Sequence, residues 1–108
     1  WGACYWGGRP TEDWMFSTTH FSGADWNDTH FKNEQFDKWL IEARAETNQN
    51  KRRQLYYEMQ KMVSDEGGTV VPMFANYVFA AHKNVQHGTM AGNWMMDGNK
   101  FHERWWFA

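Results

Sequence analysis

The sequence predicts a mixed α/β (α+β) fold in which two adjacent helices have short strands before and after them. Two amphipathic stretches, at about 33–46 and 49–65, carry the helical periodicity. Short aromatic and β-branched runs on either side of them favour strands. The chain of 108 residues is long enough for one compact domain and too short for two of ordinary size.

The N-terminal part predicts a short strand followed by a long loop. Residues 3–6 form the strand-like run, and the glycines and proline of residues 7–10 end it. From Thr11 to Lys32 the pattern follows neither period 2 nor period 3.6, and it is rich in polar turn residues with large aromatics between them. Long connections without secondary structure tend to be functional, so we expect binding residues here.

Two neighbouring helices follow. Asn33 is a good N-cap for the first, because its side chain can accept hydrogen bonds from the first turn. Apolar residues recur along one face of that helix at Phe36, Leu40 and Ala43. Residues 47–48 interrupt the pattern, and Gly67 ends the second helix. The short join predicts that the two helices pack against each other or a sheet.

The chain after the helices predicts further strands. Residues 69–74 are β-branched and apolar enough for a buried strand, with Pro72 at an edge, a bend or the strand's end. The strand can resume over residues 77–80. Glycines and polar residues interrupt the remaining tail so often that only short strands are expected there.

The composition indicates an ordered, aromatic-rich chain with nearly balanced charge. The chain is 42% hydrophobic and 19% aromatic, well above what a disordered, highly charged chain carries. Eleven basic and thirteen acidic residues give a formal net charge of −2, so no global field favours nucleic acid or an anionic membrane. No stretch approaches the roughly 20 apolar residues that a membrane span requires.

Signatures of catalysis and metal binding are missing from the sequence. The histidines do not pair at helical i, i+4 spacing or with cysteine, so no metal site is expected. The adjacent carboxylates at residues 12–13 and 65–66 suit helix capping and turns better than acid–base catalysis. Cys4 has no internal disulfide partner and lies in a strand-like run, where a thiol is usually an inert small hydrophobe. We therefore expect no enzymatic activity and no cofactor.

The most distinctive element is the run WGGRPTEDW at residues 6–14. Its glycines allow close approach of the backbone, its indoles offer rigid apolar walls, and its guanidinium suits a carboxylate. Four side chains are therefore candidate ligand-binding residues: Trp6, Arg9, Asp13 and Trp14. The alternative is structural, with Arg9 paired with Glu12 or Asp13 and the indoles in the core.

The chain resembles the C-terminal portion of the oligopeptide and dipeptide solute-binding proteins of ABC importers, the large two-lobed class that also includes nickel binders. The resemblance rests on four segments in the same order, at residues 5–16, 25–46, 50–80 and 103–108. Its most specific parts are WGGRPTEDW and the helix pair leading into GGTVVPMF. Together the segments cover nearly the whole chain.

The resemblance implies a bilobal mixed α/β fold of which this chain is a C-terminal fragment. Residues of about 1–70 would form part of the second lobe, and residues of about 71–108 would return toward the first. Such proteins capture a peptide or similar solute between their lobes outside the cytoplasmic membrane and deliver it to a membrane permease. The implied location is periplasmic or otherwise extracytoplasmic, with the signal peptide outside this fragment.

The resemblance also bears on the ligand. Trp6 falls where the family often places a ligand-contacting tryptophan. Arg9 falls where peptide binders usually carry the aspartate that receives the ligand's α-amino group. The replacement of this aspartate by arginine reverses the local charge, so an anionic group becomes the more natural partner.

Two other classes of function remain open. One is a structural or assembly module whose aromatic residues only mediate contacts between chains. The other is a small carbohydrate-binding module whose tryptophans stack on sugars. An isolated fragment with unpaired strand edges and an apolar tail is also expected to self-associate.

Overall fold

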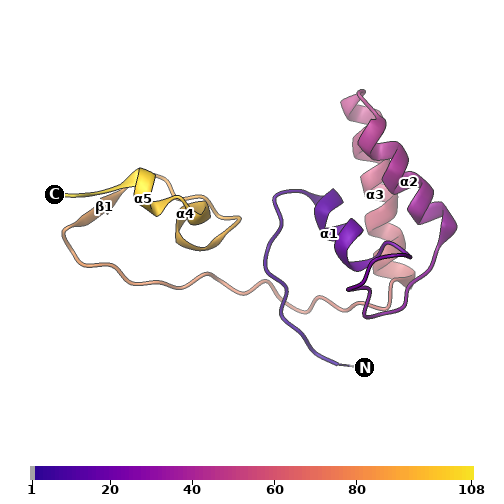
Figure 1. Cartoon of the computed structure of the whole chain (residues 1–108), viewed down its shortest axis with the longest axis horizontal. Coiled ribbons are helices and arrows are strands. Elements are labelled where there is room, and N and C mark those ends of the chain that lie inside the picture. The colour runs from indigo at the N-terminus through magenta and orange to yellow at the C-terminus, as the bar shows by residue number, and fades with distance from the viewer. Residues whose placement is uncertain (1) are drawn as a thin grey trace. The chain divides into compact units, whose positions relative to one another are not determined.

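The computed structural model describes residues 2–108 and divides them into two compact units, and Figure 1 labels their elements except β2. Residues 11–72 form a helical unit that contains α1 (Glu12–Thr19), α2 (Glu34–Ala45) and α3 (Gln49–Glu66). Residues 2–10 and 73–108 form a strand-pair unit that contains β1 (Val85–His87), α4 (Met95–Asn99), α5 (Phe101–Arg104) and β2 (Trp105–Phe107). These elements confirm the mixed α/β class. The assignment of residues 1–70 and 71–108 to two lobes stays a prediction.

The two long helices confirm the sequence prediction closely. The Asn33 side chain accepts hydrogen bonds from the backbone N–H groups of Gln35 and Phe36, at 2.9 and 3.0 Å, and so caps α2. The Asn48 side chain caps α3 in the same way. At the other end of α3, Gly68 has a φ of 69°, a left-handed conformation that glycine adopts without strain. Figure 1 shows α2 and α3 side by side, joined by their short connection.

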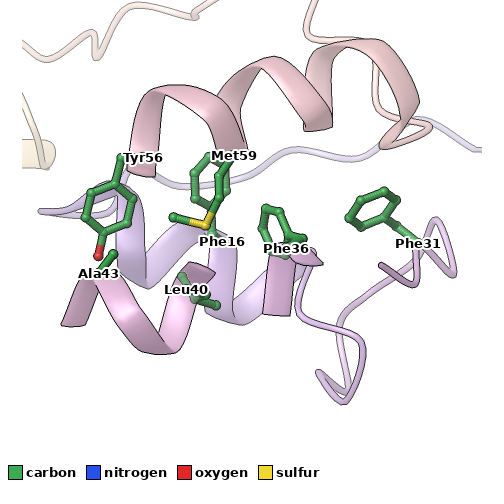
Figure 2. Packing of buried hydrophobic residues seen from close by; sticks show 7 residues of the cluster. All are labelled: Phe16, Phe31, Phe36, Leu40, Ala43, Tyr56 and Met59. Carbon is green, nitrogen blue, oxygen red and sulfur yellow. The ribbon is translucent and has the colours of Figure 1, made fainter. Parts of the chain in front are cut away.

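The core of the helical unit lies among its three helices and the turns before α2. Seven buried residues form it, as Figure 2 shows: Phe16, Phe31, Phe36, Leu40, Ala43, Tyr56 and Met59. The Phe36 ring meets the rings of Phe16 and Phe31 edge-on, with centroids 5.4 and 5.5 Å apart. Because Phe36 is fully buried and contacts aromatic rings on both sides, it joins α1 and the turns to α2.

Helix α1 corrects the prediction of a long loop from Thr11 to Lys32. The Thr11 hydroxyl accepts a hydrogen bond from the Trp14 backbone N–H at 3.3 Å, and two acidic residues occupy the first turn. The helix spans 8 residues and buries only Phe16 and Thr19. An apolar face this small leaves too little periodicity to recognise. Residues 20–33 form turns, as the sequence predicted.

The strands predicted at residues 3–6, 69–74 and 77–80 are wrong. Within residues 2–108 the strand ladder consists of β1 and β2, which pair antiparallel with Val85 opposite Phe107 and His87 opposite Trp105. The other three runs have strand-like composition but lack a pairing partner, which every strand requires. Cys4, which was expected to behave as an inert small hydrophobe within the first of these strands, is exposed.

Element α4 is an unusual left-handed turn built around a buried carboxylate. Four consecutive residues, Met96–Asn99, have φ between 48° and 70°. The Asp97 carboxylate accepts hydrogen bonds from the Ala91 backbone N–H at 2.6 Å, the Arg104 Nη1 at 2.8 Å and the Trp105 Nε1 at 3.2 Å. These charge-assisted bonds offset part of the cost of left-handed geometry at residues other than glycine.

Among the described residues, no helix has both the length and the apolar character needed to cross a membrane.

Candidate functional site

Trp6 and Arg9 form a stacked pair in the strand-pair unit. The Arg9 guanidinium carbon lies 5.7 Å from the centroid of the Trp6 ring, within the range of a cation–π interaction. Arg9 Nη1 also donates a hydrogen bond to the Gly7 carbonyl oxygen at 2.9 Å. Both side chains are half-buried. The contact with the indole and the hydrogen bond together restrict the position of the guanidinium group.

Gly8 fixes the backbone that carries this pair. Its N–H donates to the Tyr77 hydroxyl at 3.4 Å, and a Cβ atom at this position would lie 2.9 Å from the Asn93 carbonyl oxygen. Any side chain would therefore collide with the backbone of residue 93. Gly8, one of the two glycines expected to allow close approach of the backbone, allows close approach of the chain to itself.

Asp13 lies in the helical unit and makes contacts that join its three helices. Arg44 Nε donates to both carboxylate oxygens of Asp13, at 2.9 and 3.1 Å, and the Tyr56 hydroxyl donates to Oδ1 at 3.2 Å. Burial, followed by the nearby Asp13 charge, raises the pKa of Tyr56 to about 12. The hydrogen bond that Arg44 donates to Asp13 raises the pKa of Arg44. These contacts tie α1 to α2 and α3, so Asp13 has a structural part in the helical unit.

Trp14 follows Asp13 on α1, and its side chain is 46% exposed. Of the four candidate residues, the structure brings Trp6 and Arg9 into contact in one unit and places Asp13 and Trp14 in the other. A single site that uses all four residues stays a prediction. The structural alternative, in which Arg9 pairs with Glu12 or Asp13 and the indoles lie in the core, also stays a prediction. Within the helical unit, Asp13 forms an ion pair with Arg44.

Two surface hollows are further possible sites. One, of about 390 Å³, lies beside the C-terminal half of α1 and is lined in part by Ser17, Asp25 and Trp26. The other, of about 430 Å³, lies in the strand-pair unit and is lined in part by Phe101 and Trp105. Neither hollow was predicted from the sequence. Residues 11–32 were singled out as a binding segment, which contains the first, and the density of aromatic residues at 101–107 was the available signal for the second.

Within residues 2–108, no three histidine, cysteine, aspartate or glutamate side chains are placed to hold a metal ion together.

Comparison of the chain with models of protein families, with curated proteins and with solved structures finds no match in any of the three. The relation to solute-binding proteins consequently rests on the resemblance of the four sequence segments alone.

Proposed function

We propose that the chain is part of an extracytoplasmic solute-binding protein of an ABC importer, and that Arg9 and Trp6 hold an anionic group of the solute. The proposed role is capture and delivery to a membrane permease, without catalysis. The observation that carries the proposal is the Arg9 guanidinium over the Trp6 ring, next to the Gly8 backbone that packs closely against Asn93.

The stacked pair suits this role for two physical reasons. A guanidinium is a planar fork of five N–H donors that matches a carboxylate, and the bond to Gly7 together with the indole orients that fork before a ligand arrives. Half-burial also reduces the screening of its charge by water, so an ion pair there is stronger than one on an open surface.

The test measures the binding of two small peptides that differ in charge. N-acetyl-dialanine carries a carboxylate and no amine, whereas dialanine amide carries an amine and no carboxylate. We expect the full chain to bind the first in preference to the second, as measured by calorimetry and tryptophan fluorescence. Arg9→Ala should weaken the binding of the acetylated peptide about tenfold or more, because a charged hydrogen-bonding partner is lost.

Arg9→Lys should restore part of the affinity, since it returns the charge without the planar fork. Arg53→Ala is the matched control, because Arg53 is exposed on α3 in the other unit. Equal affinity of the wild-type chain and Arg9→Ala for the acetylated peptide would show that Arg9 does not contact the ligand. Preferential binding of the amide would contradict the proposal that the ligand is anionic.

An assembly role is a second candidate, because a specific observation favours it. Val70, Phe74 and Val78 are 87%, 92% and 90% exposed in a stretch that pairs with no strand of the described chain. In this alternative, an extended segment of another polypeptide pairs with residues 69–80 and covers these side chains.

A further inference from the structure

The residues that line the hollow beside α1 indicate which kind of ligand could bind there. It measures about 390 Å³, and its lining includes Ser17 and Thr18 from α1 and the stretch from Gly23 to Trp26. The Trp26 side chain is 54% exposed. A large indole face at the wall of a hollow is a platform on which a ligand can stack.

The turns that carry this indole are held in place by the buried side-chain amide of Asn27. Asn27 is only 8% exposed, and its Nδ2 donates to the carbonyl oxygens of Phe31 at 2.7 Å and Phe21 at 3.3 Å. Its Oδ1 accepts from the Phe31 backbone N–H and the Thr29 hydroxyl, each at 3.2 Å. Because the residue next to Trp26 is fixed by four hydrogen bonds, the turn that carries the indole is organised before any ligand binds.

The side-chain oxygen atoms around the hollow are available as acceptors. The hydroxyls of Ser17 and Thr18 both donate to the Trp14 carbonyl oxygen, at 3.2 and 2.6 Å, so the remaining capacity of each is as an acceptor. Asp25 adds a carboxylate, which only accepts when ionised. Among residues 2–108, no lysine, arginine or histidine is part of this lining. A ligand that suits these walls must bring N–H donors or positive charge.

We propose that this hollow binds an organic ammonium ion, with the cation over the face of Trp26 and its charge balanced by Asp25. The indole face attracts cations through its quadrupole, and the carboxylate supplies the opposite charge. The site lies in the helical unit and takes a ligand charge opposite to that assigned to Arg9, so it stands independently of the solute-binding function proposed above.

The test compares choline with 3,3-dimethyl-1-butanol, its neutral isostere in which carbon replaces the ammonium nitrogen. The readout is the indole N–H resonance of Trp26 in nitrogen-15 spectra of the full chain during titration. We expect choline to shift this resonance in a saturable way and the isostere to bind more weakly. A saturable response to methyl glucopyranoside without a response to choline would overturn the proposal in favour of carbohydrate binding.

Variants assign the contributions of the two side chains. Asp25→Asn and Trp26→Leu should each weaken choline binding about two- to fivefold or more, the effect expected for one exposed cation contact, as followed by calorimetry. Both positions are exposed, so neither change should prevent folding. Asp28→Asn is the matched control, because Asp28 is an exposed carboxylate of the same turns that does not line the hollow. Equal binding of choline and its isostere, absence of saturable choline binding, or unchanged affinity in Asp25→Asn would overturn the proposal.

Discussion

His20 is a titratable side chain enclosed by the aromatic core, and it is only 6% exposed. Its Nδ1 lies 2.6 Å from the Thr19 hydroxyl oxygen, and its Nε2 lies 3.2 Å from that of Thr69. The rings of Phe16 and Phe31 have centroids 6.1 and 6.2 Å from that of the imidazole. Burial lowers the pKa of His20 below its ordinary value of 6.5, because the charged form loses its hydration.

This lowered pKa predicts that the helical unit loses stability in mild acid. As the pH falls below about 6.5, the unfolded chain takes up a proton that folded His20 still excludes. The free energy of unfolding should therefore be highest above that pH and should decrease as the pH falls toward the lowered pKa. Urea unfolding at about pH 7.5 and about pH 5.5 measures the loss.

His20→Gln should reduce this dependence on pH, because the amide keeps hydrogen-bonding capacity without titrating. His30→Asn is the control, since His30 is exposed and asparagine tolerates its φ of 55°. If His20→Gln lost as much stability as the wild-type chain over this range, another group would be responsible.

The structural role of a single residue was predictable from the sequence where that role depends only on its neighbours in the chain. The Asn33 cap needs only its own side chain and the next turn, and it was predicted correctly. The buried roles of Asn27 and His20 depend on partners brought together by folding, including Thr69, which is distant in the sequence. Polar residues in a turn-rich stretch give no sign of such burial.

At the scale of elements, the helices were predictable and the strands were not. The hydrogen bonds of α2 and α3 lie within each segment, so periodicity and capping residues were sufficient evidence. A strand forms only when another segment supplies its partner, and residues 69–74 have the composition without the partner. The pairing of Val85 with Phe107 joins two segments far apart in the sequence, which the local pattern could not reveal.

Helix α2 provides a matched test of its buried face. Leu40 is 1% exposed, whereas its neighbour Ile41 is 61% exposed. Leu40→Ala should lower the free energy of unfolding by about 2–5 kcal/mol, because it leaves a cavity in the core. Ile41→Ala should change that free energy by only about 0.5 kcal/mol. Similar losses in the two variants, measured by urea unfolding, would contradict the packing of α2.

For the molecule as a whole, the extended stretch after α3 is the segment best suited to pair with another chain. Residues 67–81 contain no charged side chain, and most of their large apolar side chains are exposed. Uncharged, apolar segments with unpaired backbone are prone to pair with other chains. The sequence supplied the composition behind this inference, and the structure added that the backbone pairs with no strand of the described chain.

The isolated chain should accordingly self-associate as its concentration rises. Sedimentation velocity should show a growing weight-average mass, and Val78→Lys should reduce that growth because charge opposes pairing of an exposed strand. Ile41→Lys is the control, since it adds the same charge to an exposed apolar position on a helix. A monodisperse monomer at high concentration would contradict the expectation, and equal effects of the two variants would point to net charge instead of the extended stretch.

The exposure of Cys4 gives the molecule one uniquely reactive position. Because the chain has no other sulfhydryl, a maleimide dye would couple at a single site, two residues before the Trp6 indole. Quenching of such a dye by the indole would make the surroundings of the Trp6 and Arg9 pair observable one molecule at a time, without altering either residue.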